Sequence, residues 1–288
     1  MTQFVPQLMG VVNVTPDSFS DGGLYTTVEA ATNHARQLAE AGAQILDIGG
    51  ESTRPGAERV GVAEEINRVV PVIEAIVSSH WYRQLGAEKP ALSVDTMNAA
   101  TAIAAVEAGA AYVNDVAGGL ADPAMLAAVA ATPAKYILGH WRGHSSQMDN
   151  LAVYQNVAAD VASELADRVT AATEAGITRE RILLDPGLGF AKDANQNWQI
   201  LANLDPLVRL QLPLVIGASR KRFLVAALQA DPTEVDNVRR DAATATLAAL
   251  LVAGPYSANI AMLRVHNIGV NRDAIDIALA LKPSRVAG

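Results

Sequence analysis

The 288-residue sequence contains no cysteine, which excludes disulfide bonds, thiolate nucleophiles and cysteine-based zinc sites. A chain without cysteine also fits a reducing compartment. Positive charge is scarce as well, since 22 lysine and arginine residues stand against 30 aspartate and glutamate residues, for a formal net charge of -8. Because binding to nucleic-acid phosphates needs a basic surface, this balance argues against a nucleic-acid partner.

Long apolar runs are missing too. The longest nearly apolar run, residues 242–254, is too short to span a bilayer and contains two threonines. The first ten residues have neither a basic start nor a long apolar core, so no signal peptide is expected. Half of the residues are hydrophobic and only 18% are charged, which allows a large buried core. These features predict a soluble cytoplasmic protein.

Several common catalytic and binding motifs are also absent. The chain has no Gly-x-Ser-x-Gly elbow and no Walker-type phosphate loop, so Ser219 is a poor candidate for an activated nucleophile. The Gly-x-Gly of residues 185–192 is followed by Lys192 where a dinucleotide-binding loop needs its third glycine. No histidine and acidic residue show metal-ligand spacing, so no zinc site is expected.

What the sequence does contain is an internal repeat. Glu-Ala-Gly ends at Gly42, Gly109 and Gly176, and an apolar segment that ends in Asp or Asn plus glycines follows each time. These glycines lie 67 residues apart, and Gly254 repeats the pattern later. Each is predicted to end a helix in the left-handed conformation, which suits a residue without Cβ. A period of this length corresponds to two strand–helix units of ordinary size.

Eight apolar segments of strand length alternate with amphipathic, alanine-rich helical segments. This alternation predicts a (β/α)8 TIM barrel that forms one domain over residues 1–288. An open doubly wound sheet is the alternative, although that fold usually has fewer units. The predicted strands cover residues 8–13, 45–48, 91–95, 111–114, 135–139, 182–185, 214–217 and 260–265.

In such a barrel the functional residues collect at the carboxyl ends of the strands. Segment 214–223 stands out there, because an apolar strand runs through Gly-Ala-Ser into Arg220, Lys221 and Arg222 at the start of a predicted helix. A helix start with this much positive charge suits an anionic ligand, although three solvated surface cations are the alternative. The other polar residues at strand ends are Asn13, Asp47, Glu51, Asp95, Asn114, Asp115, His140, Arg142, Asp185, Arg264 and His266.

Two groups of strand-end residues indicate a ligand. Asp95, Asn114 and Asp185 suggest a neutral heterocycle, since a carboxylate accepts two hydrogen bonds from an amidine-like N–H and NH₂ pair. These carboxylates could instead satisfy nearby backbone amides. Arg264 and His266 lie two residues apart on the last strand and so point the same way, as a diphosphate clamp requires.

Seven segments in order along the chain resemble dihydropteroate synthase. The similarity covers nearly the whole sequence, and the first two segments are long and unusual. The segments are MGVVNVTPDSFSDGG (9–23), DIGGESTRPG (47–56), SVDT (93–96), NDV (114–116), DPGLGFAK (185–192), SRK (219–221) and RVH (264–266).

The resemblance implies a transferase of folate biosynthesis that transfers an alkyl group other than methyl. Such an enzyme joins 6-hydroxymethyl-7,8-dihydropterin diphosphate to 4-aminobenzoate and releases dihydropteroate and diphosphate. The family further implies Mg²⁺ as cofactor, these small molecules as binding partners, a homodimer, and a target of sulfonamides. It implies neither a membrane nor a nucleic-acid partner.

The resemblance also implies roles for single residues. The pterin is assigned to Asp95, Asn114, Asp185 and Lys221, of which Asp95 and Lys221 are the catalytic pair. Asn13 is assigned to Mg²⁺, for which an amide oxygen is a suitable ligand. The diphosphate is assigned to Thr53, Arg54, Arg264 and His266. The aminobenzoate is assigned to Phe19, Thr53, Pro55, Ser219 and Arg222.

Two positions depart from the family pattern. Many members have serine where this chain has Arg222, so the contact to the substrate carboxylate is expected to shift to Arg222 or its backbone N–H. The usual Arg-Val-His-Asp ends here in Asn267. Arg220 receives no role, and Lys192 is expected outside the pocket, with a mild effect of Lys192→Ala.

Two other functions remain open at this point. One is a pterin-binding methyltransferase barrel of the methyltetrahydrofolate type, which shares the pterin acids. It does not need the turn of residues 219–221 or a diphosphate clamp. The other is a catalytically silent paralogue that binds pterin.

Overall fold

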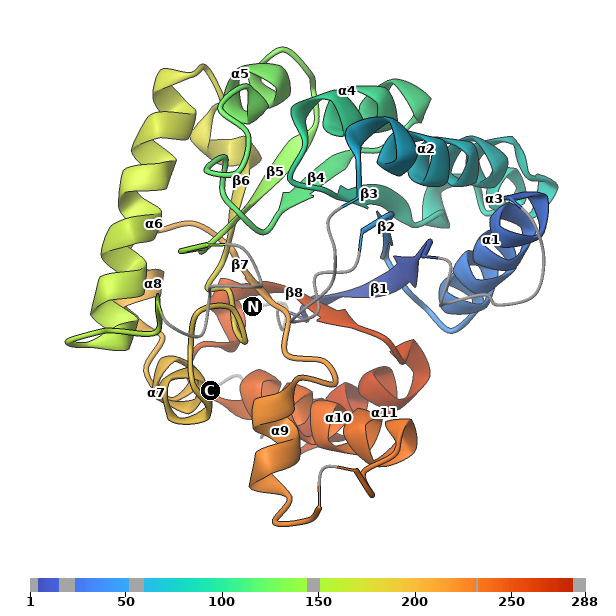
Figure 1. Cartoon of the computed structure of the whole chain (residues 1–288). Helices are drawn as coiled ribbons and strands as arrows, with labels where there is room; N and C mark the ends of the chain where they lie inside the picture. The colour runs from blue at the N-terminus through green and yellow to red at the C-terminus, as the bar shows by residue number, and fades with distance from the viewer. Residues whose placement is uncertain (1–4, 16–23, 52–59, 144–150, 232, 282–288) are drawn as a thin grey trace, which may run out of the picture.

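The structure is a computed structural model that describes residues 5–15, 24–51, 60–143, 151–231 and 233–281. Its eight strands run parallel and pair in chain order, and β8 pairs with β1 to close a barrel (Figure 1). The predicted (β/α)8 barrel is confirmed, and the open sheet is excluded. The strands are β1 (Gln7–Asn13), β2 (Ile45–Gly49), β3 (Ala91–Asp95), β4 (Tyr112–Asp115), β5 (Lys135–Gly139), β6 (Ile182–Asp185), β7 (Leu214–Ile216) and β8 (Ile260–Val265).

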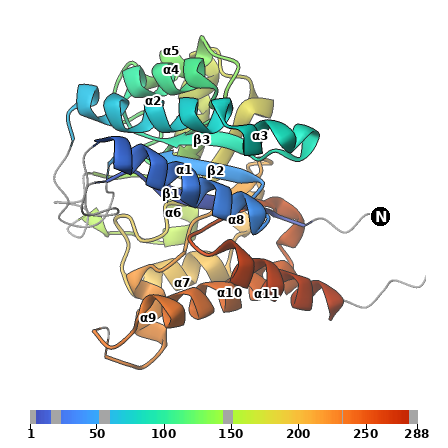
Figure 2. The same cartoon turned by 90° about the vertical axis from the view of Figure 1, so that its right-hand side faces the viewer.

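Helices surround the barrel. Figure 2 shows it from the side, with the start of β1 and the end of α11 at the same end. Among the described residues, no helix combines the length and apolar character needed to cross a membrane. The helices are α1 (Leu24–Glu40), α2 (Val62–Ser78), α3 (His80–Gln84), α4 (Ala99–Ala108), α5 (Met125–Ala130), α6 (Val157–Glu174), α7 (Ala194–Ala202), α8 (Asp205–Val208), α9 (Arg222–Ala227), α10 (Asn237–Ala253) and α11 (Ile268–Ala280).

The alternation of side chains along the strands separates two apolar clusters. Residues such as Leu46, Val94 and Leu184 point outward and pack with the helices in one large cluster. The residues that point inward form a second, smaller cluster, which fills the barrel interior. This inner apolar layer consists of Met9, Ile45, Tyr112, Ile137, Leu183, Val215 and Met262.

The glycine repeat is explained by backbone conformation at three of its four positions. Gly42, Gly109 and Gly176 have φ angles of 100°, 123° and 102°, so the prediction of left-handed helix ends is confirmed there. The prediction is wrong for Gly254, whose φ is -75° and ψ is 176°. Pro255 follows it, and a residue before proline favours the extended conformation.

Candidate active site

A layer of polar side chains lies directly above the inner apolar layer. Successive side chains on a strand alternate, so the residue two positions beyond an inward apolar residue also faces the interior. The strand order places each of these polar residues at the carboxyl end of the barrel. The pairs along the strands are Ile45 and Asp47, Tyr112 and Asn114, Leu183 and Asp185, and Met262 and Arg264.

Arg264 joins two buried carboxylates in this polar layer. Its Nε donates to Asp47 Oδ2 at 2.6 Å, and its Nη2 donates to Asp95 Oδ2 at 2.7 Å. Asn114 Nδ2 donates to the same Asp47 oxygen at 2.9 Å. A buried carboxylate is costly unless a charge and hydrogen bonds compensate it, and Arg264 supplies both here. Arg264, predicted for the diphosphate, therefore lies among the predicted pterin residues.

Asp47 is a strand-end residue to which the sequence assigns no role. Its side chain is 0% exposed and accepts hydrogen bonds from both Asn114 and Arg264, so it holds these two predicted site residues in place. The signal was available, because Asp47 follows the inward Ile45 by two residues on the same strand.

Burial changes the proton affinity of the acids. Burial raises the pKa of Asp95 to about 7, with Asp47 adding to the rise and the positive charge of Arg264 opposing it. Burial likewise raises the pKa of Asp185, and Lys221 opposes that rise. Asp185 Oδ1 also accepts a hydrogen bond from the Gly187 backbone N–H at 2.7 Å.

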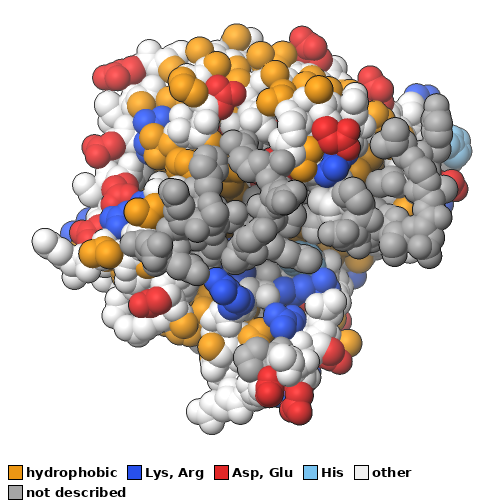
Figure 3. Space-filling view, viewed as in Figure 1, with side chains coloured by type: hydrophobic (Ala, Val, Ile, Leu, Met, Phe, Trp, Pro, Cys, Tyr) orange, Lys and Arg blue, Asp and Glu red, His pale blue; other side chains and the backbone are white. Residues whose placement is uncertain are grey.

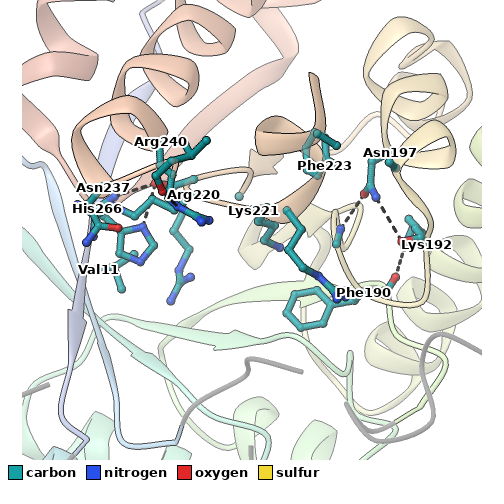
Figure 4. Close-up of a pocket in the computed structure, with 18 of the residues that line it drawn as sticks. Val11, Phe190, Lys192, Asn197, Arg220, Lys221, Phe223, Asn237, Arg240 and His266 are labelled. Carbon is teal, nitrogen blue, oxygen red and sulfur yellow. Dashed lines mark hydrogen bonds between the residues drawn. The ribbon is translucent and has the colours of Figure 1, made fainter. Parts of the chain in front are cut away.

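Lys221 enters the site from the start of α9. Its Nζ donates to the backbone carbonyl of Leu188 and lies 4.3 Å from the centre of the Phe190 ring (Figure 4). Burial lowers the pKa of Lys221 to about 8, while the charge of Asp185 raises it. The ammonium thus binds the loop that follows β6 and is attracted by the charge of Asp185.

Arg220, for which no role was predicted, fastens the turn before Lys221 to α10. Its Nε and Nη2 donate to the two carboxylate oxygens of Asp241 at 2.7 and 2.8 Å, and its backbone N–H donates to Thr244 Oγ1 at 3.2 Å. Its φ of 59° is unusual for a residue with a side chain. The buried Asp241 was missed because nothing in its local sequence indicates this partner.

Asn267, the second departure from the family pattern, contacts the same carboxylate. Its Nδ2 donates to Asp241 Oδ2 at 3.2 Å, and its Oδ1 accepts from the backbone N–H of Val270 as the N-cap of α11. An amide is therefore useful at this position, because it donates to Asp241 where a carboxylate could not.

Ser219 and His266 connect the predicted aminobenzoate and diphosphate sites. Ser219 Oγ lies 2.9 Å from His266 Nδ1 and accepts a hydrogen bond from the His266 backbone N–H at 3.2 Å. Arg222 is exposed on the same wall, in the first turn of α9. The two predicted sites are therefore adjacent.

One cavity of about 1310 Å³ covers this region, with room for two small-molecule substrates. Figure 3 shows lysine and arginine side chains gathered on this face of the molecule. Asn114 and Asp185 lie in the polar layer beneath the cavity. The predicted site residues that line it are Asn13, Asp95, Ser219, Lys221, Arg222, Arg264 and His266. The other predicted residues, Phe19, Thr53, Arg54 and Pro55, lie outside the described residues.

The expectation that Lys192 lies outside the pocket is wrong. Lys192 lines the cavity and is buried, with a hydrogen bond of 2.9 Å between its Nζ and His140 Nδ1. Burial lowers the pKa of Lys192 to about 7 and that of His140 to about 4. His140 also contacts Glu164 at 2.9 Å through Nε2.

The residues present suit a magnesium ion that arrives with its ligand. Among the described residues, no three His, Asp or Glu side chains gather to hold a metal. Asn13 ends β1, lines the cavity and offers one amide oxygen. Because Mg²⁺ commonly binds through one or two protein ligands, waters and substrate phosphates, this donor set fits Mg²⁺ carried on a diphosphate.

Comparisons with known proteins identify the family of this chain. The model of the pterin binding enzyme family matches residues 9–266. A dihydropteroate synthase of Streptococcus pyogenes is 43% identical over 270 residues, which cover 94% of this chain and 93% of the relative. The chain belongs to the dihydropteroate synthase family. This membership favours a synthase over the methyltransferase that the sequence left open.

Solved structures of the dihydropteroate synthase family share the fold. The Xanthomonas albilineans enzyme with 4-aminobenzoic acid is 41% identical, with a TM-score of 0.84, and the match covers 98% of this chain and 96% of that one. The same enzyme in complex with 7,8-dihydropteroate gives 38% identity and a TM-score of 0.81, and the match covers 98% and 97% of the two chains.

Proposed function

We propose that this member of the dihydropteroate synthase family joins 6-hydroxymethyl-7,8-dihydropterin diphosphate to 4-aminobenzoate in the cavity above the polar layer. The observation that carries the proposal is the meeting of Asp95, Asp185 and Lys221 beside one cavity, from three elements far apart in sequence. We also propose, from the family resemblance, a homodimer in the cytoplasm.

The polar layer supplies the pterin site in this proposal. Asp95 accepts hydrogen bonds from the amidine-like edge of the pterin, with Asn114, Asp185 and Lys221 around the ring.

The diphosphate lies between Arg264 and His266, with help from Thr53 and Arg54. Arg264 donates two of its five N–H groups to Asp47 and Asp95, so three N–H groups remain for the phosphate oxygens. Asn13 would hold Mg²⁺ here, and the ion would neutralise part of the charge on the leaving group.

The aminobenzoate lies against the turn that carries Lys221. Its carboxylate binds Arg222 and Ser219 at the start of α9, and its ring packs near Phe190. Phe19, Thr53 and Pro55 complete this site in the proposal. A guanidinium binds a carboxylate through two parallel hydrogen bonds, so Arg222 can replace the serine of other members.

The reaction needs no protein nucleophile. The amine nitrogen forms a bond to the pterin methylene carbon, the carbon–oxygen bond to diphosphate breaks, and the electron pair leaves with the diphosphate while the amine loses a proton. Asp95 stabilises the positive charge that develops on the pterin, and Arg264 and His266 stabilise the leaving group. Holding both substrates in line contributes at most about 7–11 kcal/mol.

The decisive experiment incubates the purified protein with both substrates and Mg²⁺ and measures dihydropteroate. Lys221→Ala is expected to lose nearly all turnover, because it removes the ammonium between the two substrate sites. Lys89→Ala is the matched control, since Lys89 is exposed before β3 at the other end of the barrel. A wild-type protein that binds pterin and forms no product would be the silent paralogue instead.

A further inference from the structure

The loop between β6 and α7 has an unusual backbone. Gly187, Gly189 and Ala191 have φ angles of 66°, 76° and 46°, and at Ala191 this left-handed conformation costs roughly 1–2 kcal/mol. A Cβ on Gly187 would overlap the backbone carbonyl oxygen of His140, so the loop presses against the end of β5. A loop of this shape needs contacts that hold it.

Lys192 supplies these contacts from inside the loop. Its side chain is buried, with only 7% of the residue exposed, and its Nζ makes three hydrogen bonds. They go to His140 Nδ1 at 2.9 Å, to the Gly187 carbonyl at 3.0 Å and to the Phe190 carbonyl at 3.0 Å. An ammonium has three N–H groups, so all of them are used.

His140 connects this ammonium to the next helix. Since Lys192 donates to Nδ1, the proton of the neutral imidazole resides on Nε2, which donates to Glu164 Oε2 at 2.9 Å. Arg142 also binds Glu164 and stacks 3.8 Å from the ring centre of Tyr154. The Tyr154 hydroxyl in turn donates to the Ala191 carbonyl at 2.9 Å, so the loop is held from both sides.

The opposite side of the loop contacts Lys221. The Leu188 carbonyl accepts from Lys221 Nζ, and the Phe190 ring lies beneath that ammonium. In Figure 4 Phe190 lies between Lys221 and Lys192. The two lysines thus bind different carbonyls of one short segment, Lys192 at Gly187 and Phe190 and Lys221 at Leu188.

We propose that Lys192 is a positioning residue for the reaction. By fixing the Gly187 and Phe190 carbonyls, it sets the place of the Leu188 carbonyl and the Phe190 ring, and these determine where the Lys221 ammonium lies. Lys192 contacts no substrate in this proposal and acts through Lys221 and the Phe190 ring. The inference rests on the role proposed above for Lys221.

Lys192→Met tests the proposal, because it keeps an unbranched side chain of similar length and removes the three hydrogen bonds. We expect KM for aminobenzoate to rise about tenfold and kcat to fall, since Lys221 loses its fixed position. Binding of the pterin diphosphate alone is expected to weaken by less, about threefold, because Lys221 is one of its four proposed pterin contacts and Asp95 and Asn114 lie on other strands. Lys89→Met is the control for loss of a lysine.

Tyr154→Phe extends the test in case Lys192→Met does not fold. It keeps the ring that stacks with Arg142 and removes one hydrogen bond to the same loop, so KM for aminobenzoate is expected to rise about threefold. Unchanged kinetics in a folded Lys192→Met, or in Tyr154→Phe when Lys192→Met is not recovered, overturns the inference. So does an equal loss of affinity for both substrates, which a merely structural role predicts. Full turnover in Lys221→Ala would instead refute the proposed role of Lys221.

Discussion

Arg220 combines two features that a pair of substitutions can separate. Its guanidinium binds both oxygens of Asp241, and its backbone has a left-handed φ of 59°. Arg220→Ala removes the ion pair and leaves a Cβ in the left-handed conformation. Arg220→Gly removes the ion pair and the Cβ together. The difference between the two variants therefore isolates the backbone conformation.

The structure gives the expected sizes of these effects. Asp241 is 5% exposed, and removing the partner of a buried charge costs about 3–5 kcal/mol. The lower value of about 3 kcal/mol applies to Arg220→Ala, because Asn267 still donates to Asp241 and the Arg220 side chain is 30% exposed. Arg220→Gly is expected to lower the free energy of unfolding by only about 2 kcal/mol. Glycine relieves the strain of the left-handed backbone, a gain of roughly 1 kcal/mol after the entropy cost of glycine itself.

Thermal unfolding followed by circular dichroism measures both effects. A loss of 1 kcal/mol shifts Tm by about 2 °C in a chain of this size, so Tm is expected to fall by about 6 °C for Arg220→Ala and about 4 °C for Arg220→Gly. Gln211→Gly is the matched control, because Gln211 is exposed before β7 with a φ of 55°. It is expected to raise Tm slightly and to leave the kinetics unchanged.

The pH dependence gives a further check on the ion pair. Burial raises the pKa of Asp241, but the hydrogen bonds and positive charge of Arg220, with a hydrogen bond from Asn267, lower it. The pKa of Asp241 in the folded protein is therefore below its usual value. A depressed carboxyl pKa adds stability above the unfolded value of about 3.9, and this stability is lost as the pH falls through the folded value. The gap between wild type and Arg220→Ala should therefore narrow below pH 4. The reasoning would be refuted if Arg220→Gly had a lower Tm than Arg220→Ala. A stability difference between wild type and Arg220→Ala that did not change with pH would refute it as well.

Two further predictions concern acids of the site. Because burial raises the pKa of Asp95 to about 7, its carboxylate takes up a proton as the pH falls below 7 and ceases to accept two hydrogen bonds. Pterin affinity measured by calorimetry should weaken from pH 8 to pH 6 more steeply in wild type than in Asp95→Asn, whose affinity is weak throughout; an equal slope in both would contradict this role. Asn267→Asp should lower Tm by about 2–4 °C, because Asp241 loses a donor worth on the order of 1–2 kcal/mol and gains a like charge, while the N-cap of α11 is kept. An unchanged Tm would show that the amide at position 267 contributes nothing.

The fold could be predicted because its signals are local. The repeat of Gly42, Gly109 and Gly176 and the alternation of strand and helix segments need only short stretches of sequence. The error at Gly254 has a local cause as well, since the proline that follows it decides its conformation. A glycine at the same place in the repeat therefore adopts an extended conformation at residue 254 and a left-handed one at the other three positions.

The candidate site could be predicted only in part, because its contacts join distant segments. The strand-end positions of Asp95, Asp185 and Lys221 were visible in the sequence, and the structure brings them to one cavity region. Asp47 lies 217 residues from Arg264 in sequence, and the local sequence around either residue does not indicate that the two form an ion pair. Lys192 was misjudged for the same reason, since its contact with His140 spans 52 residues.

The inner apolar layer determines how molecules move through the site. Met9, Ile137 and Val215 are fully buried and fill the barrel beneath Asp95. Substrates therefore reach the acids from the rim, and products leave by the same route. A ligand that binds to Asp95 therefore has to enter the cavity before a second ligand that binds nearer the rim. We expect the pterin diphosphate to bind before the aminobenzoate.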